Sequence, residues 1–204
     1  MMAGAITLID YGVGNLGSVV RAFNRLNVSV DLSSDPKRVS GSRLLVLPGV
    51  GHFGESMMNL RDRGLEQPIT EALAAGARLL GICVGFQMLF DSSEEAPGVP
   101  GLGLLPGKVR RFPEDLTVPH IGWNQLENTT AVPLLDGIGD GDYFYFLHSY
   151  YAAPADDQRA LASTDYGLRF CSVAGNGSVA GIQFHPEKSQ ALGLRVLENF
   201  CRRS

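Results

Sequence analysis

A cysteine between two glycines is the first candidate for chemistry in this sequence. Residues 79–87 read Leu-Leu-Gly-Ile-Cys-Val-Gly-Phe-Gln, so Cys83 follows an apolar run and precedes a helix-like segment. A sharp turn from strand to helix projects a side chain into a strained, accessible position, and flanking glycines let the neighbouring backbone approach closely. A helix that begins there also favours the thiolate. The pattern predicts a thiol nucleophile elbow, and the alternative is a buried, unreactive cysteine.

A histidine and a carboxylate that could activate this thiol lie near the other end of the chain. Residues 181–187 read Gly-Ile-Gln-Phe-His-Pro-Glu, which places His185 and Glu187 at the end of an apolar run. Side chains two residues apart in extended backbone point the same way. A histidine can take the proton of a thiol, and a carboxylate on its other nitrogen fixes the tautomer and stabilises the imidazolium. We predict a Cys83–His185–Glu187 triad; the alternative is a turn histidine beside a solvated glutamate.

The remaining cysteines and histidines are weaker candidates. Cys171 and Cys201 complete a set of three cysteines with no Cys-x-x-Cys and no histidine at ligand spacing, so we expect no disulfide framework, no metal site and no cofactor. This usage fits the cytoplasm. His52, His120 and His148 are expected to pack or to hydrogen-bond rather than to act as a second base.

The order of apolar segments indicates how these residues are positioned. In the first half, short apolar runs alternate with helix-like patterns, which is typical of βα units on a parallel sheet, and glycines and prolines mark their ends. Expected strands cover 6–9, 28–32, 44–47 and 79–82, and expected helical segments cover 16–26, 53–75 and 86–90. Loops at the carboxyl ends of such strands often carry function.

In the second half the pattern changes to strands and a closing helix. Expected strands cover 108–112, 123–126, 143–151, 161–164, 170–174 and 179–184, with a helix over 192–201. Residues 92–107 are predicted to form a surface loop, because the strands on either side cannot bury themselves alone. The fold class is therefore α/β: one domain over 1–204, with a mixed, mostly parallel central sheet, flanking helices and added antiparallel strands.

Composition excludes several classes of partner. The net charge is -4, and no run of Lys or Arg is longer than a pair, so neither nucleic acid nor a membrane surface is an expected partner. The aromatic run 143–151 has no accompanying cations, so we interpret it as a strand with both faces partly covered rather than a platform for bases. Residues 1–9 are expected to form a first strand rather than a signal peptide, and no apolar run approaches the roughly 20 residues that span a bilayer.

Together, the cysteine elbow and the His-Pro-Glu segment resemble the class I glutamine amidotransferases. Within that group the chain is similar, over nearly its whole length, to the glutaminase subunits of imidazole glycerol phosphate synthases, which act in histidine biosynthesis. The segments that carry this similarity are Ile-Asp-Tyr-Gly-Val-Gly-Asn-Leu at 9–16, Leu-Pro-Gly-Val-Gly at 47–51, Pro-His-Ile-Gly-Trp-Asn at 119–124 and Gln-Phe-His-Pro-Glu-Lys-Ser at 183–189.

The resemblance implies roles for residues around the nucleophile. Cys83 would attack the glutamine carboxamide, His185 would protonate the departing ammonia and then activate water, and Glu187 would orient His185. The backbone N–H of Val84, next to the nucleophile, is expected to hold the oxyanion. Further expected site residues are Val50 and Gly51 in the oxyanion loop, and Gly51, Gln87, Glu95, Ser149 and Tyr150 in the glutamine site.

The resemblance also implies a partner. One amidotransferase domain accounts for all 204 residues, so the consumer of ammonia is expected on a separate chain. That partner would be a (β/α)₈-barrel cyclase, joined in a heterodimer, whose core conducts ammonia to a ribonucleotide. Asn15, Trp123 and Lys188 match positions near the docking face, where a lysine can pair with a carboxylate across the interface.

Three other interpretations remain open on the sequence alone. The first is a glutaminase subunit of another synthase, for pyridoxal phosphate or anthranilate, with the same triad and a different docking surface. The second is a noncatalytic scaffold on the same fold, which would be expected to lack a triad member. The third is a different cysteine hydrolase, which a glutamine-like electrophile would distinguish from a glutaminase.

Overall fold

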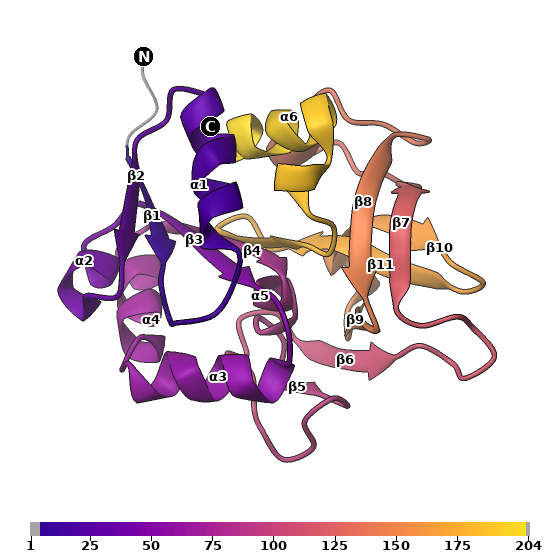
Figure 1. Ribbon diagram of the computed structural model, residues 1–204, viewed down its shortest axis with the longest axis horizontal. Helices are drawn as coiled ribbons and strands as arrows, with labels where there is room; N and C mark the ends of the chain where they lie inside the picture. The colour runs from indigo at the N-terminus through magenta and orange to yellow at the C-terminus, as the bar shows by residue number, and fades with distance from the viewer. Residues whose placement is uncertain (1–4, 203–204) are drawn as a thin grey trace.

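The computed structural model describes residues 5–202 and has a ten-stranded mixed sheet at its centre (Figure 1). Its first half is parallel, and its inner strands are buried almost throughout because helices cover both faces, whereas the edge strand is partly exposed. The order is β2-β1-β3-β4-β12, with β1 (Ile6–Ile9), β2 (Val30–Ser33), β3 (Leu44–Gly49), β4 (Arg78–Cys83) and β12 (Val179–Ile182). The last of these comes from the far end of the sequence and lies beside β4.

The second half of the sheet is mainly antiparallel, as the sequence predicts. Beyond β12 the order continues through β11 (Arg169–Gly175), β9 (Tyr150–Pro154), β6 (Gly107–Arg111) and β5 (Ser92–Ser93), and β10 (Ala160–Asp165) pairs with β11. The mixed α/β fold class is therefore confirmed. Residues 1–4 and 203–204 of the expected domain 1–204 lie outside the described residues, and so do residues 1–4 of the expected first strand.

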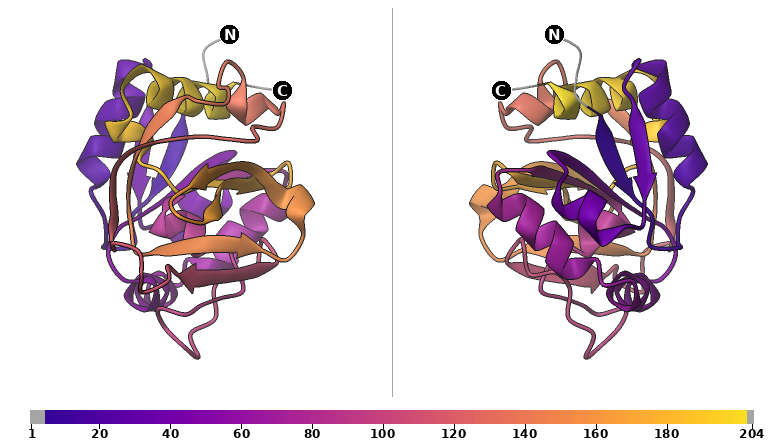
Figure 2. Two further views of the ribbon diagram at one scale, coloured as in Figure 1. Left: turned by 90° about the vertical axis from the view of Figure 1, so that its right-hand side faces the viewer. Right: turned by 90° about the vertical axis from the view of Figure 1, so that its left-hand side faces the viewer.

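Helices pack on both faces of the parallel half (Figures 1 and 2). On one face, α1 (Leu16–Arg25) contacts α6 (Gln190–Cys201), and on the other α2 (Pro36–Ser40) contacts α4 (Glu66–Ala74), with α3 (Phe53–Asp62) before it. Right-handed crossovers require this arrangement, because the chain reverses direction across the sheet after β2. Short 3₁₀ turns lie at η1 (Pro133–Leu135), η2 (Asp157–Arg159) and η3 (Pro186–Lys188).

A separate two-stranded sheet of β7 (His120–Gln125) and β8 (Tyr143–His148) stands beside α6, at the right of Figure 1. The pairing places His120 opposite His148 and Trp123 opposite Tyr145, so even-numbered residues face inward and odd-numbered residues face outward. We define the outer face of β7–β8 by its large side chains: Ile121, Trp123, Tyr143, Tyr145 and Leu147. All except the half-buried Tyr145 are exposed, so the strand expected over 143–151 is less covered on this side than the sequence indicates.

Most expected elements shift by one to three residues at an end, and three differ more. The strand expected over 143–151 divides at Ser149, where the chain leaves β8 and enters β9 of the main sheet. The helical stretch 53–75 divides into α3 and α4 at Gly64, whose φ of +65° favours glycine. The helix expected over 86–90 is the one-turn α5 (Val84–Gln87), which starts directly after the cysteine.

Within residues 5–202, no helix has the length and apolar character needed to cross a membrane. Likewise, in this part of the chain no three His, Cys, Asp or Glu side chains gather in an arrangement that could hold a metal ion.

Candidate active site

The two ends of the predicted triad meet because β4 and β12 are parallel neighbours. Ile82 pairs with Ile182, so both strands end at the same edge of the sheet. Cys83 is the last residue of β4, and His185 lies three residues beyond the end of β12. Carboxyl ends of parallel strands are where α/β proteins commonly place functional side chains. The topology therefore brings together two residues that are remote in sequence.

The backbone at Cys83 has the strained geometry of a nucleophile elbow. Its φ of +55° is in a region that non-glycine residues rarely adopt. A Cβ atom on Gly85 would overlap the carbonyl oxygen of Leu47, and one on Gly81 would lie 2.6 Å from the carbonyl oxygen of Gly85. The glycines are thus required by close backbone approach. Cys83 is only 3% exposed, and it lines a small cavity.

Substituting Gly85 with alanine is expected to disrupt this turn. Because the added methyl group would meet rigid backbone of β3 rather than a flexible side chain, we expect a loss of roughly 2–4 kcal/mol in the free energy of unfolding. Chemical denaturation of Gly85→Ala measures it. Gly139→Ala is the matched control, since a Cβ there meets nothing within 4 Å and its backbone lies outside the left-handed region that favours glycine. A Gly85→Ala protein as stable as the control would contradict the proposed close packing.

His185 is held between Cys83 and the carboxylate of Glu187. Its Nδ1 lies 2.9 Å from Oε1 of Glu187, and both side chains are almost fully buried. The main chain of His185 is fixed by its N–H to the carbonyl of Tyr145 and by the hydroxyl of Ser189, which donates to its carbonyl. Burial opposes the charged imidazolium, but hydrogen bonds and charge interactions with Cys83 and Glu187 outweigh it and raise the pKa of His185 to about 10. The ring is therefore protonated at neutral pH.

The three cysteines differ in their surroundings. All are free and buried, but only Cys83 lies beside a histidine and lines a cavity with it. Burial raises the pKa of Cys171 to about 12 and that of Cys201 to about 11. Both therefore remain protonated thiols at neutral pH, which are poor nucleophiles. Cys83 is the cysteine suited to chemistry.

A cavity of about 190 Å³ opens at Cys83. Each residue predicted for the oxyanion hole or for glutamine binding lines it, together with both Cys83 and His185; Glu187 lies behind His185. The remaining lining residues, which the sequence analysis did not select, are Pro119, Leu147 and His148. The complete set of lining residues is Val50, Gly51, Cys83, Val84, Gln87, Glu95, Pro119, Leu147, His148, Ser149, Tyr150 and His185.

Gln87 is oriented by hydrogen bonds to Tyr150 and Gln183. Its Nε2 donates to the carbonyl of Tyr150 at 2.9 Å and to Oε1 of Gln183 at 3.1 Å. Both amide protons are thus used, which leaves the Gln87 oxygen for the cavity. Gln183 also places its Nε2 3.8 Å from Cys83 Sγ. Gln183 was not predicted as a site residue, although it is two residues before His185, where side chains of an extended chain point to the same side.

Glu95 is less free than the resemblance suggests. Its Oε2 accepts the backbone N–H of Phe53 at 2.7 Å, which ties it to the start of α3. It nevertheless lines the cavity, so its role in binding glutamine stays a prediction.

Comparison with known proteins identifies the family. The protein-family model described as "Glutamine amidotransferase class-I" matches residues 7–204 of the chain. This chain belongs to the class I glutamine amidotransferases. Among relatives of this amidotransferase, "Imidazole glycerol phosphate synthase subunit HisH" of Dehalococcoides mccartyi strain CBDB1 is 47% identical over 97% of this chain and 96% of the relative. The protein of the same name from Moorella thermoacetica is also 47% identical, over 96% of this chain and 93% of the relative.

Solved structures agree on the fold of this amidotransferase. A protein described as "Crystal structure of glutamine amidotransferase" superposes with a TM-score of 0.76 and 21% identity, covering 97% of this chain and 99% of that one. "Structure of PurLQS from Thermotoga maritima" gives a TM-score of 0.75 at 18% identity, with 98% of each chain covered. At these identities the likeness concerns the fold alone.

Two of the three residues predicted for the docking face of the amidotransferase lie close together. Trp123 is 46% exposed on the outer face of β7–β8 and meets the ring of Tyr145 edge to face. Lys188 places its Nζ 5.4 Å from the centre of the same tyrosine ring, within reach of a cation–π interaction. Asn15 is exposed at the start of α1, which contacts η3, the turn that carries Lys188. No partner is present, so an interface role for all three stays a prediction.

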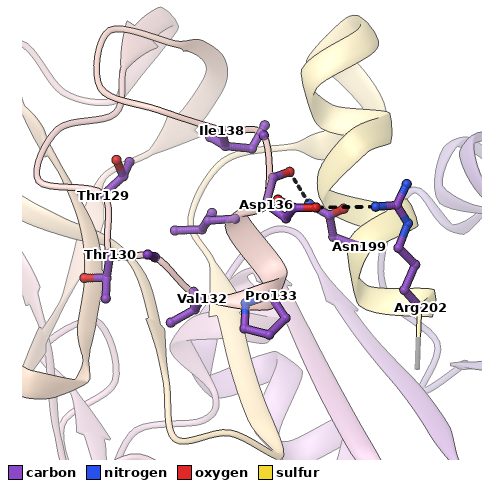
Figure 3. A pocket seen from close by; sticks show the side chains of 11 residues that line it. Thr129, Thr130, Val132, Pro133, Asp136, Ile138, Asn199 and Arg202 are labelled. Atoms are coloured by element: carbon purple, nitrogen blue, oxygen red, sulfur yellow. Dashed lines mark hydrogen bonds and ion pairs between the residues drawn. The ribbon is translucent and has the colours of Figure 1, made fainter. Parts of the chain in front are cut away.

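A larger cavity of about 610 Å³ lies at the opposite end of the amidotransferase (Figure 3). Arg202 lines this cavity, and its carbonyl accepts a hydrogen bond from Arg78, the first residue of β4. Cys83 is the last residue of the same strand, so the two cavities lie at opposite ends of β4. Asn199 donates there to the carbonyl of Asp136 at 2.8 Å. None of the predicted site residues lines this cavity. Its lining consists of Thr129, Thr130, Ala131, Val132, Pro133, Leu135, Asp136, Gly137, Ile138, Asn199 and Arg202.

Proposed function

We propose that this chain is the glutaminase subunit of an imidazole glycerol phosphate synthase, which hydrolyses glutamine to glutamate and ammonia and supplies the ammonia to a cyclase subunit. The observation that carries the proposal is that Cys83 and His185 line one small cavity with Glu187 bonded to His185 behind it, in a chain 47% identical over nearly its whole length to relatives with that subunit name. The cyclase would use the ammonia to make imidazole glycerol phosphate and aminoimidazole carboxamide ribotide. Because this is a step of histidine biosynthesis, we place the protein in the cytoplasm.

In the first half-reaction, Cys83 forms a thioester. Its sulfur bonds to the carboxamide carbon of glutamine, and the carbonyl becomes an oxyanion held by the N–H of Val84 and by the loop of Val50 and Gly51. The carbon–nitrogen bond then breaks. His185 gives its proton to the departing nitrogen, and its raised pKa means that the required proton is present at neutral pH.

In the second half-reaction, water hydrolyses the thioester. His185, now neutral, takes a proton from water while the oxygen bonds to the carbonyl carbon. The carbon–sulfur bond breaks and glutamate leaves, so Cys83 and His185 return to their starting states. Throughout, Glu187 accepts the Nδ1–H of His185 and stabilises its charged form. The amino-acid end of glutamine is held by Gln87, Glu95 and the main chain of Gly51, Ser149 and Tyr150.

The outer face of β7–β8 is the proposed docking surface for the cyclase, which we expect to be a (β/α)₈ barrel. Its apolar side chains are exposed, and such a patch beside charged residues is typical of protein–protein interfaces. Lys188 adds a cation that a carboxylate of the partner can pair with. The backbone of this sheet also reaches the nucleophile, because the carbonyl of Leu147 lies 3.7 Å from Cys83 Sγ. Docking would therefore occur directly beside the site of ammonia release.

Glutamate release tests this proposal. Glutamine hydrolysis is measured for this protein alone, and then with a cyclase subunit and its ribonucleotide ligand. We expect little release by the isolated chain and at least about tenfold stimulation in the complex, because docking contacts the strands that line the site. Trp123→Ala should weaken the stimulation, whereas Met58→Ala, at an exposed apolar residue of α3, should not. Unstimulated release with a competent cyclase would contradict the assignment to this synthase.

A further inference from the structure

A string of hydrogen bonds runs from the β7–β8 sheet to the cavity. Nδ2 of Asn124 lies 3.3 Å from Nε2 of His120, and Nδ1 of His120 lies 3.1 Å from Nε2 of His148. Nδ1 of His148 then lies 2.8 Å from the carbonyl oxygen of Tyr150. The string thus begins on β7 and ends on a carbonyl at the edge of the cavity.

The position of every proton in this string follows from its two ends. A carbonyl only accepts, so Nδ1 of His148 carries a proton, and in the neutral ring its Nε2 accepts from Nδ1 of His120. By the same reasoning, Nε2 of His120 accepts from the Asn124 amide. That amide is oriented independently, because its nitrogen also donates to the carbonyl of Asp165 at 2.9 Å and its oxygen accepts from the N–H of Gln125. Both ends therefore require that the hydrogen bonds are donated in the direction from Asn124 to the Tyr150 carbonyl.

The surroundings of the two rings favour the neutral forms that the string requires. Both imidazoles are buried among aromatic side chains, and His120 stacks on Tyr166 with ring centres 4.0 Å apart. Burial lowers the pKa of His148 to about 3 and that of His120 to about 4. Since a neutral imidazole has one donor and one acceptor, each ring is fully used by its two neighbours in the string.

The carbonyl at the end of the string is shared with Gln87. The Tyr150 oxygen accepts both from Nδ1 of His148 and from Nε2 of Gln87. If this carbonyl moved, Gln87 would lose the partner that directs its own oxygen toward the cavity. The two histidines therefore act on the cavity through Tyr150 and Gln87.

We propose that His148 and His120 are positioning residues for the substrate: they hold the Tyr150 carbonyl where it orients Gln87, and they transfer no proton in the reaction. This proposal rests on the proposed function, since it takes glutamine to be the occupant of the cavity. It follows that breaking the string weakens glutamine binding and leaves the chemistry at Cys83 largely intact. KM should then change more than kcat.

Two substitutions of His148 separate the role of its Nδ1, the donor to Tyr150, from that of its Nε2, the acceptor from His120. The amide nitrogen of asparagine can take the place of Nδ1 and keep the bond to Tyr150, whereas glutamine places its amide near Nε2 and loses that bond. With the protein in its activated complex, we expect His148→Gln to raise the KM for glutamine about tenfold with kcat within about threefold, as the loss of one buried hydrogen bond implies. His148→Asn should stay within about threefold of wild type in KM. Equal effects of the two variants on KM, or a loss confined to kcat, would overturn the proposal.

The tautomers can be read without any substitution or activity. The chain has four histidines, and ¹⁵N chemical shifts of the imidazoles at neutral pH distinguish a proton on Nδ1 from one on Nε2. We expect two neutral rings protonated on Nδ1, assigned as His120 and His148 by their loss in His120→Asn and His148→Asn. A proton on Nε2 of His148 would refute the string. If the string is present but glutamine is not hydrolysed in the complex, the proposed function fails instead.

Discussion

Replacing Cys83 with alanine should abolish glutamine-dependent synthesis by the complex while leaving synthesis from ammonium salt at the wild-type rate. Without the thiolate no thioester forms, and we expect glutamine hydrolysis to fall by at least about 10³-fold. Free ammonia enters the reaction after this step, so the cyclase on the other chain does not need Cys83. The measurement is the rate of product formation from each nitrogen source, with the complex assembled and its stoichiometry verified.

Cys201→Ala is the matched control for this variant. It removes another buried thiol, on α6, that does not line the cavity, and the variant should keep both activities. Loss of the ammonium-dependent reaction in a properly assembled Cys83→Ala complex would contradict the division of chemistry between two chains. Retention of the glutamine-dependent reaction would exclude Cys83 as the nucleophile.

Glu187→Gln should lower kcat for glutamine by at least about 10²-fold. The amide oxygen of glutamine can still accept from Nδ1 of His185, so the ring keeps its position, but the negative charge that stabilises the imidazolium is lost. The pKa of His185 falls from its raised value, and the basic limb of the pH–rate profile should therefore shift to lower pH. The new NH₂ group replaces Oε2, a buried atom with no hydrogen-bond partner in the described structure, and adds an unsatisfied donor.

The pH profile separates an electrostatic role of Glu187 from a purely structural one. Glu198→Gln, which changes an exposed ion-pair partner of Arg202 on α6, serves as control and should alter neither kcat nor the profile. An unchanged profile in Glu187→Gln, with kcat near wild type, would show that the carboxylate does not set the protonation of His185.

Most of the parallel half of the fold was predictable because its longer elements have a local signal. The strand at 6–9 agrees with β1 in both bounds, and the helix at 16–26 agrees with α1 to within one residue. The helix α2 was missed, although Asp35 and Pro36 form a cap and a first-turn proline, because five residues carry too little periodicity. Short elements of this kind depend on tertiary packing more than on pattern.

The division of 143–151 could not be read from the sequence. Aromatic residues stand on both sides of His148 and Ser149, and no glycine or proline marks a break, so the pattern favours one strand. The break is produced by remote partners: β8 pairs with β7, and β9 pairs with β6 and β11. For the same reason the exposure of the outer face of β7–β8 was not foreseen, since exposure depends on what covers a sheet.

The sequence also indicated which side chains would meet at the candidate site, whose roles stay predictions. Cys83 and His185 have characteristic neighbours in sequence, and the strand ends at which they lie are adjacent for topological reasons. The residues that the sequence did not single out act through hydrogen bonds across the fold. Gln183 and the His120–His148 pair are of this kind, because their contacts depend on elements far apart in the chain.

Covalent labelling of Cys83 tests the central claim most directly. The complex with the cyclase is treated with a glutamine analogue that carries an electrophile at the γ-carbon, and peptide mass spectrometry locates the adduct. We expect one adduct, on Cys83, formed in step with loss of glutaminase activity and prevented by excess glutamine. Labelling of Cys171 or Cys201, or inactivation that glutamine does not slow, would contradict the assignment of this cavity as a glutaminase site.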